Sequence, residues 1–237
     1  MQRYFSKECQ NNYFTLNTDD LYHIVTVMRM VTGEQVEVVF DKKVYLCSLE
    51  ISNKEVLVRK EKLLQDEVFN EKEIVLLVPL LKEHKMDYIL QKATELGVSK
   101  IIPVIMERSI VKLDKSKENK RLERWTRICK EASEQSMRVT IPTITEVRTW
   151  EQVKDLDGVK IVCSTSEKQN TIKMFLQSHQ SCDKMIIVVG PEGGLAPREE
   201  TFLNNHGFVS VTLGNRIMRV ETAPLFVLSV INYEYME

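Results

Sequence analysis

Two glycine-rich segments near the C-terminus carry the residues best suited to hold a small molecule. The first, residues 190–195, reads Gly-Pro-Glu-Gly-Gly-Leu and directly follows an apolar run at 185–189. The second, residues 213–224, reads Leu-Gly-Asn-Arg-Ile-Met-Arg-Val-Glu-Thr-Ala-Pro. Because glycines leave backbone N–H and C=O groups unscreened by side chains, a ligand can approach the main chain closely there. We predict that both segments are loops of one site, although the first alone also fits a strand-to-helix turn with Pro197 at the first helical position.

The order of the glycines does not match two common phosphate-binding motifs. A Walker loop needs Lys-Ser or Lys-Thr after its last glycine, whereas Gly194 is followed by Leu-Ala-Pro. A dinucleotide fingerprint needs Gly-x-Gly-x-x-Gly, which this segment does not contain. The pattern therefore favours a compact, mostly uncharged ligand, such as an adenosine group held by main-chain hydrogen bonds between loops.

The spacing of apolar residues predicts the elements that carry these loops. Apolar runs predict strands at 74–80, 101–105, 159–163, 185–189 and 208–213. Helical spacing predicts helices at 86–96, at 116–132 with Ser116 as N-cap, and from about 221 to 232. Strands that alternate with helices indicate an α/β fold with a mainly parallel sheet. Ligands of such sheets bind outside the carboxyl ends of the strands, where both glycine-rich segments begin.

A different pattern occupies the N-terminal part of the chain. Short strand-like runs at 35–39, 44–47 and 55–58 are separated by turn residues, which predicts a small β-rich barrel. The polar stretch 61–72 is expected to join this module to the rest. We therefore divide the chain into one domain at 1–70 and a second at 73–237.

The composition is that of an ordinary soluble protein with reduced cysteines. The 237 residues carry a net charge of −1, and 43% are hydrophobic, which is enough for a normal core. The first twenty residues have no apolar signal core, and no apolar run reaches the roughly 18 residues of a membrane helix, so a cytoplasmic location without a membrane partner is expected. The cysteines are scattered and suit neither a disulfide framework nor a metal site: Cys9, Cys47, Cys129, Cys163 and Cys182.

Positive charge concentrates between Arg108 and Arg138. This stretch contains ten lysines and arginines against five acidic residues. Such a run is either a surface that faces nucleic-acid phosphates or a solvated helix face. The charge pattern alone leaves both interpretations open.

Several different motifs follow one another in a defined order along nearly the whole chain. The C-terminal ones are 190–194, Glu199, Leu213-Gly214 and 217–223. The others are His23-Ile24-Val25, Met28-Arg29, Gly33, 91–97, Pro103, Arg108-Ser109, Trp125, Glu131-Ala132, 134–136, Arg138 and Ile141-Pro142. Together they resemble the ribosomal RNA small subunit methyltransferase E family of the SPOUT superfamily. The departures leave every charged group of the pattern in place and bear on selectivity more than on activity: Met28, Ala196, Met218 and Val220.

The resemblance implies a fold, a reaction and partners. The C-terminal half is expected to form a SPOUT domain with a deep trefoil knot, and the N-terminal barrel a PUA-like RNA-binding module. Members of the family use S-adenosyl-L-methionine to methylate N3 of a uridine in 16S rRNA of the small ribosomal subunit. They act as homodimers, with the active site completed across the subunit interface. Apolar helix faces around Leu90 and Leu228 are compatible with a dimer or with an ordinary core.

The same resemblance assigns the donor pocket to both glycine-rich segments. Glycines would let the donor approach the backbone, aliphatic residues would sandwich the adenine, and Thr222 could add a hydroxyl contact. The run 164–166 could form a third wall. The residues assigned to the donor are Thr165, Gly190, Gly193, Gly194, Leu195, Leu213, Gly214, Ile217, Met218 and Thr222.

Methylation of uridine N3 requires removal of an imide proton, which spreads negative charge over O2 and O4. Arg219 is the first candidate for stabilising that charge, because a guanidinium can donate hydrogen bonds to the charged oxygens. This residue also lies beside the donor pocket in the sequence. Glu192 or Glu221 could accept the proton, yet either could instead hold a loop or cap a helix. The reaction requires no metal.

Four residues are expected to contact RNA. His23 and Arg29 lie in the motif of the N-terminal barrel, although a structural role at a turn is the simpler alternative for His23. Arg108 and Arg138 flank the basic stretch and could act on the partner's substrate. Two other functions stay open, namely ribose 2′-O-methylation by the same fold and a ribosome-binding module without activity. The intact Gly193-Gly194 and Arg219 argue against the second.

Overall fold

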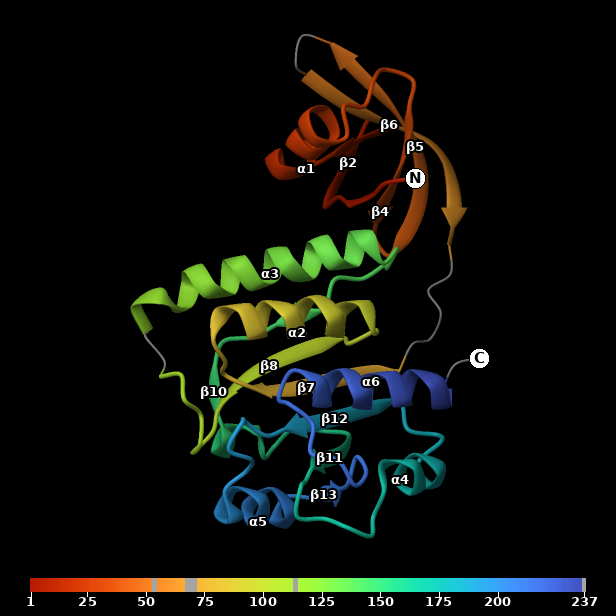
Figure 1. The fold of residues 1–237 in the computed structure, drawn as a ribbon. Coiled ribbons are helices and arrows are strands. Elements are labelled where there is room, and N and C mark those ends of the chain that lie inside the picture. The colour runs from red at the N-terminus through yellow and green to blue at the C-terminus, as the bar shows by residue number, and fades with distance from the viewer. Residues whose placement is uncertain (53–54, 67–71, 113–114, 236–237) are drawn as a thin grey trace. The chain divides into compact units, whose positions relative to one another are not determined.

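The computed structural model describes residues 1–52, 55–66, 72–112 and 115–235, and the chain divides into two compact units (Figure 1). Unit 1 comprises Met1–Glu71 with Ser133–Thr140, and unit 2 comprises Lys72–Ala132 with Ile141–Glu237. The sequence placed residues 133–140 in the second domain, whereas their contacts group them with unit 1. The other expected boundary, near residues 70–73, falls at the junction of the two units.

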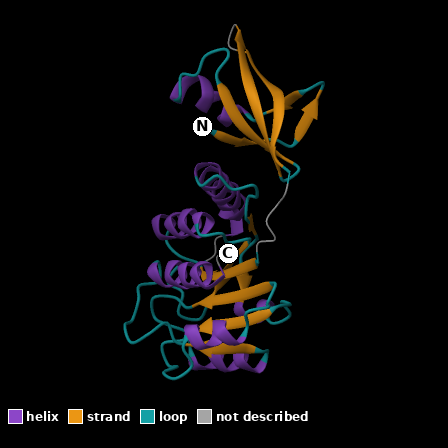
Figure 2. Ribbon diagram, turned by 90° about the vertical axis from the view of Figure 1, so that its right-hand side faces the viewer, coloured by secondary structure: helices purple, strands orange, loops and turns teal. Residues whose placement is uncertain are grey.

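Unit 1 is built on a six-stranded sheet with the strand order β1-β4-β5-β6-β3-β2. β1 pairs with β4 in parallel, and the other neighbours are antiparallel. Figure 2 shows this sheet with a short helical segment beside it. The elements are β1 (Arg3–Phe5), β2 (Glu8–Gln10), β3 (Tyr13–Thr15), α1 (Thr18–Tyr22), η1 (His23–Val27), β4 (Gln35–Phe40), β5 (Lys43–Ser52) and β6 (Glu55–Gln65). β6 thus runs into the segment at 61–72 that was expected to be only a joint.

Alternating side chains along β4 and β5 build the core of unit 1. Val36 and Val38 on β4, and Cys47 and Leu49 on β5, are fully buried, as the two-residue period of a strand requires. The hairpin between these strands turns at residues 41 and 42, whose φ angles of 50° and 58° fit a two-residue turn of type I′. The strands predicted at 35–39, 44–47 and 55–58 are therefore confirmed, each with a longer extent than predicted.

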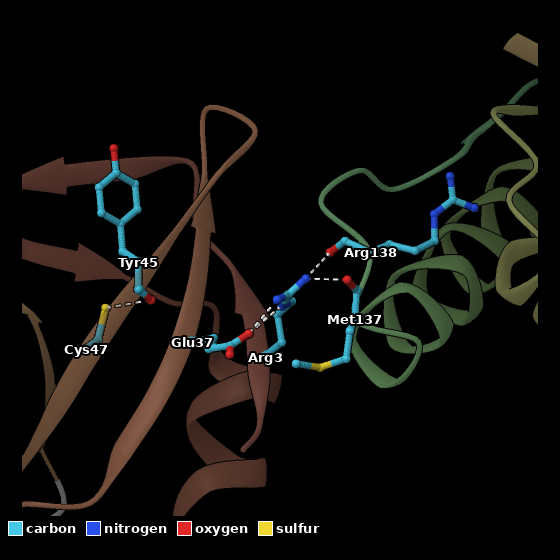
Figure 3. Close-up of polar contacts among 6 residues, drawn as sticks. All are labelled: Arg3, Glu37, Tyr45, Cys47, Met137 and Arg138. Atoms are coloured by element: carbon cyan, nitrogen blue, oxygen red, sulfur yellow. Dashed lines mark hydrogen bonds and ion pairs between the residues drawn. The ribbon is translucent and has the colours of Figure 1, made fainter. Parts of the chain in front are cut away.

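Arg3 joins β1 to the segment that follows α3 (Glu118–Gln135) (Figure 3). Its side chain is 8% exposed, and its Nη2 lies 2.5 Å from Oε2 of Glu37 on β4. Its Nη1 donates hydrogen bonds to the backbone oxygens of Met137 and Arg138. The chain leaves the helix through a left-handed residue, Met137, with a φ of 60°. Arg3 therefore fixes the chain just after the end of α3 to the edge of this sheet.

Unit 2 contains a parallel sheet with the strand order β10-β8-β7-β12-β11-β13, and β9 also pairs with β8. Each of its strand pairs is parallel. The first half comprises β7 (Glu73–Pro79), α2 (Glu83–Glu95), β8 (Lys100–Ile105), η2 (Lys115–Lys117), α3, β9 (Thr143–Ile144), β10 (Arg148–Thr149) and η3 (Trp150–Val153). The second half comprises β11 (Val159–Cys163), α4 (Ile172–Ser178), β12 (Lys184–Val189), α5 (Pro197–Asn205), β13 (Phe208–Val211) and α6 (Thr222–Tyr235).

Helices pack on both faces of this sheet. Ile74, Leu76 and Val78 of β7 pack in one cluster with residues of α2, α3, α4 and α6. Val75 and Leu77 point to the other face, where they share a cluster with residues of η3 and α5. The predicted class, an α/β fold with a mainly parallel sheet and an N-terminal β-unit, is confirmed, and the trefoil knot stays a prediction. Among the described residues, no helix has the length and apolar character needed to cross a bilayer.

Candidate functional site

A cavity of about 590 Å³ opens at the carboxyl ends of three neighbouring strands of unit 2. β12, β11 and β13 end at Val189, Cys163 and Val211, and the loops that follow them form the walls. This is the edge where an open parallel sheet binds its ligands. The lining residues are 85, 163–166, 168, 189–195, 200, 212–220 and 223.

The first glycine-rich loop forms one wall largely with its backbone. Gly194 has a φ of 70° and donates its N–H to the oxygen of Pro191 at 2.8 Å, which closes a tight turn. A Cβ on Gly190 would lie 3.2 Å from the backbone nitrogen of Leu195, so the absence of a side chain lets the two ends of the turn come together. Pro197 then begins α5. The segment is thus both a strand-to-helix turn and a cavity wall.

The loop that follows β8 ties this glycine-rich loop in place. Glu199 is 0% exposed, and its two carboxylate oxygens accept the backbone N–H groups of Glu107 at 2.7 Å and Ala196 at 2.8 Å. Ala196 precedes α5 and has no side-chain acceptor, so Glu199 supplies the reciprocal half of a capping box without the usual hydroxyl. One buried carboxylate therefore holds two separate loops together.

Arg108 adds a second connection between the same loops. Its Nη1 donates to the backbone oxygens of Gly193 at 2.8 Å and Leu195 at 3.3 Å. A Cβ on Gly193 would lie 3.3 Å from the Cβ of Arg108, so the arginine packs over the bare glycine. The side chains of Glu107 and Arg198 form an ion pair at 2.6 Å. We call these contacts of residues 107–108 with residues 193–199 the loop brace.

The second glycine-rich segment forms the opposite wall and leads into α6. Gly214 has a φ of 116°, a conformation that other residues rarely adopt. Ile217 is 87% exposed at the rim of the cavity. The backbone oxygen of Arg219 accepts the N–H groups of Thr222 and Ala223 at 2.9 and 3.1 Å, which starts the helix. These bonds hold the backbone of Arg219 at the start of the helix, and its exposed side chain lies at the cavity.

Lys85, in the first turn of α2, contacts both loops. Its Nζ lies 3.0 Å from Oε1 of Glu192 and 3.3 Å from Oε2 of Glu221. The hydrogen bond to Glu192, together with that to Glu221, raises the pKa of Lys85 above its ordinary value. The pKa of the Glu221 carboxyl is lowered, first by a hydrogen bond from the backbone N–H of Glu221 itself and then by Lys85. Lys85 and Glu221 therefore both stay charged near neutral pH.

The chain after β11 forms a third wall. Ser164 is 6% exposed, and its Oγ accepts the backbone N–H groups of Ser166 at 3.0 Å and Glu167 at 3.2 Å. The backbone oxygen of Thr165 accepts a hydrogen bond of 2.6 Å from Nζ of Lys168. Burial raises the pKa of the neighbouring Cys163 thiol to about 12, so this cysteine is neutral in the site.

The cavity brings together most residues that the sequence assigned to one site. Those that line it are Thr165, Gly190, Glu192, Gly193, Gly194, Leu195, Leu213, Gly214, Ile217, Met218 and Arg219. Glu221 and Thr222 are outside the lining; Glu221 still reaches Lys85, whereas Thr222 is exposed at the first position of α6. Sequence reasoning missed Lys85, because its partner Glu192 is 107 residues away and helical spacing gives no signal for such a contact.

The four residues expected to contact RNA occupy different places. His23 starts η1, and its Nδ1 lies 2.9 Å from the hydroxyl of Tyr4. Arg29 is exposed and has a φ of 53°. Arg138 belongs to the segment grouped with unit 1, and its Nη2 donates to Oγ1 of Thr140 at 3.3 Å. The guanidinium of Arg108 instead bonds to the glycine-rich loop of its own chain.

The two leucines considered for a dimer interface belong to the core. Leu90 of α2 and Leu228 of α6 are both 0% exposed and lie in the same hydrophobic cluster. The core interpretation of these two side chains is therefore correct. On the outer side of α6, Tyr233 is 79% exposed.

Comparison with known proteins agrees with both units. A family model described as an RNA methyltransferase domain matches residues 69–232, and one described as an RNA methyltransferase PUA domain matches residues 16–61. The chain is 37% identical to ribosomal RNA small subunit methyltransferase E of Bacillus subtilis, over 99% of this chain and 97% of the relative. It is 35% identical to the enzyme of the same name from Mesomycoplasma hyopneumoniae, over 97% and 98% of the two chains.

Two solved structures are similar over almost their whole length. Ribosomal RNA small subunit methyltransferase E of Neisseria gonorrhoeae, bound to S-adenosyl methionine, has a TM-score of 0.83 and 33% identity, with 98% and 97% of the chains covered. A methyltransferase from Legionella pneumophila in complex with the same cofactor has a TM-score of 0.89 and 30% identity, with 98% and 96% covered. With this fold, this cavity and these full-length similarities, the chain belongs to the ribosomal RNA small subunit methyltransferase E family.

Proposed function

We propose that this chain transfers a methyl group from S-adenosyl-L-methionine to N3 of a uridine in the 16S rRNA of the small ribosomal subunit. The observation that carries the proposal is a cavity with two backbone-lined walls, at the carboxyl edge of the sheet, in a chain of this family. Similar structures with 30% and 33% identity hold S-adenosyl methionine.

The residues of the cavity fit this donor. A volume of about 590 Å³ lies within the range of sites for small molecules. The bare backbone at Gly193 and Gly194 suits the hydrogen-bonding edge of an adenine, and Leu195 and Leu213 offer apolar surface for its faces. Charged side chains at the same cavity suit the charged amino-acid part of the donor. When bound, the donor supplies an electrophilic methyl group on a sulfonium.

Arg219 is the residue that we propose to stabilise the acceptor base. Loss of the N3 proton spreads negative charge over two uracil oxygens, and a guanidinium can donate hydrogen bonds to that charge. Arg219 lines the cavity and is exposed, and its backbone is held by hydrogen bonds at the start of α6. Its contribution should therefore appear in turnover rather than in binding of the donor.

For the N3 proton we propose Glu192 as acceptor ahead of Glu221. Glu192 is among the residues that line the cavity, whereas Glu221 is not. The pKa of Glu221 is lowered by its own backbone N–H and by Lys85, which makes it a weaker base. We assign Glu221 to holding the start of α6 against α2 through Lys85.

Unit 1 is proposed to bind the RNA, with His23, Arg29 and Arg138 among its contacts. The match of residues 16–61 to a PUA domain supports this role. Arg108 is assigned first to the loop brace, because its guanidinium bonds to two loop carbonyls. We further propose a homodimer that works in the cytoplasm, a trefoil knot in unit 2, and domains at 1–70 and 73–237, apart from the segment 133–140, whose contacts group it with unit 1.

The test uses the purified full chain with small ribosomal subunits from a strain that lacks the gene. Transfer of a labelled methyl group is measured, and the modified nucleoside is identified and mapped. We expect 3-methyluridine at one position. A 2′-O-methylated nucleoside would instead support ribose methylation, and binding of subunits without any transfer would support a non-catalytic module.

Two arginine variants, one inside the cavity lining and one outside it, provide a matched pair. We expect Arg219→Ala to lower kcat by at least about 100-fold, the scale of one lost charge-stabilising donor, while the Kd for the donor stays within twofold. Arg127→Ala, which removes the same charge from an exposed position of α3 outside the cavity lining, should retain most of the turnover. Equal turnover of the wild type and Arg219→Ala would remove Arg219 from the mechanism.

A further inference from the structure

A second cavity lies beside the first turn of α2, outside the donor site. It has a volume of about 330 Å³ and is lined by residues of α2, of α3 and of the segments before them. Leu81, Val111 and Trp125 give it apolar surface, and Lys82, Glu83, Arg121 and Arg124 give it charge. Three cations against one carboxylate make this lining predominantly positive.

Two of the three cations form no ion pair in the part of the chain that the structure describes. Arg124 is held by ion pairs to Asp87 and, at 3.5 Å, to Glu83. Lys82 is exposed, and Nη1 of Arg121 is buried with no hydrogen-bond partner. A buried guanidinium nitrogen without an acceptor is costly, so it points to an anionic ligand. The arginine fork matches the oxygens of a phosphate in particular.

The position of this cavity relates it to the reaction. Lys82 and Glu83 line it, whereas Lys85, less than one helical turn further along α2, lines the donor cavity. Both cavities therefore lie within unit 2, and residues at the start of α2 line each of them. An RNA strand whose target base enters the donor cavity would pass this second cavity with its backbone.

We propose that the cavity between α2 and α3 binds a backbone phosphate of the rRNA next to the methylated nucleotide, through Arg121 and Lys82. This inference rests on the proposed function. It names a contact that holds the substrate in register beside the donor cavity. Leu81 and Trp125 are buried and give the same cavity apolar surface, and a hydrogen bond from an arginine to an anion is stronger in such surroundings than in open water.

The experiment measures methylation of small ribosomal subunits from a gene-deleted strain by Arg121→Gln, Lys82→Gln and Arg127→Gln. Arg127 is the matched control, because it lies on the same helix, is 61% exposed and is absent from the lining. At about 0.1 M salt, we expect Arg121→Gln to raise the KM for subunits by roughly 10-fold, the effect of one charge-assisted hydrogen bond. Loss of one phosphate contact should also reduce the slope of log affinity against log salt by about 0.7 to 0.9. The Kd for S-adenosyl-L-methionine should stay unchanged, and Arg127→Gln should behave like the wild type.

Three results would overturn the proposal. The first is an equal effect of Arg121→Gln and Arg127→Gln on the KM for subunits. The second is a loss of donor affinity in Arg121→Gln that parallels its higher KM. The third is a higher KM of Arg121→Gln with an unchanged salt slope, which would indicate a contact with protein. If Arg121→Gln does not fold, the exposed Lys82→Gln gives the same test. A wild-type chain that methylates no subunits would instead refute the proposed function, so the two failures are distinguishable.

Discussion

The loop brace predicts a large effect of a change that removes only one charge. In Glu199→Gln the side chain keeps its size and one acceptor oxygen, but an amide NH₂ replaces the other oxygen. In the wild type both oxygens accept backbone N–H groups, at 2.7 Å from Glu107 and 2.8 Å from Ala196. The variant therefore loses one bond and places two donors against each other at a site that is 0% exposed.

The magnitude follows from the burial and the charge of this carboxylate. A hydrogen bond to a charged group contributes about 1.5–3 kcal/mol, and we take this range as the whole cost of the change. For a chain of this size, each kcal/mol lowers the melting temperature by roughly 2–4 °C, so we expect Glu199→Gln to melt about 3–12 °C lower. The affinity for S-adenosyl-L-methionine should also fall, because Ala196 ends the glycine-rich loop.

The assay compares thermal unfolding and calorimetric donor binding of Glu199→Gln, the wild type and Glu123→Gln. Glu123 is exposed on α3, so the same chemical change there should shift the melting temperature by less than about 1 °C. If Glu199→Gln melts together with Glu123→Gln and binds the donor normally, the carboxylate does not hold the two loops, and the brace has no energetic role.

Two further predictions concern the lysine between the loops and a buried thiol. Lys85→Met should bind S-adenosyl-L-methionine several-fold more weakly in calorimetry, because Lys85 contacts both loops. Its melting temperature should change little, because the side chain reaches solvent. The control Lys92→Met, which removes a lysine paired within α2, should bind the donor normally. Burial raises the pKa of Cys47 to about 12. Above about pH 8.5 the unfolded chain therefore releases a proton that the folded chain keeps. As the pH rises, this residue should lower the free energy of unfolding by at most about 1.4 kcal/mol per pH unit. Denaturant unfolding between pH 8 and 10 should show this slope, and an equal slope in Cys47→Ala would contradict it.

The central strands and the place of the site were predictable because their signals are local. β7 and β12 are buried on both faces, so they read as continuous apolar runs, and glycines mark the loops after the strands. The three-residue strands β1, β2 and β3 were not predicted, because a run that short has no period.

Contacts between distant residues explain what the sequence could not reveal about the site. The bonds of Glu199 to Glu107 and of Arg108 to Gly193 span 92 and 85 residues, and only the completed sheet brings them together. For the same reason Ser133–Thr140 appeared to belong to the second domain, whereas Arg3, more than 130 residues earlier, holds their backbone. The exposed position of Thr222 depends on where α6 begins, and helix boundaries are poorly fixed by periodicity.

The late position of the cavity walls along the chain has a consequence for synthesis on the ribosome. Apart from Lys85, the residues that surround the cavity all come after residue 162. A nascent chain that has emerged only to the end of α3 already contains the strands of unit 1 and Arg108 itself, yet it lacks Gly193 and Leu195, whose carbonyl oxygens this arginine must meet. The polypeptide therefore acquires its capacity to hold a cofactor only in the last stage of translation, and truncated products should be inert toward it.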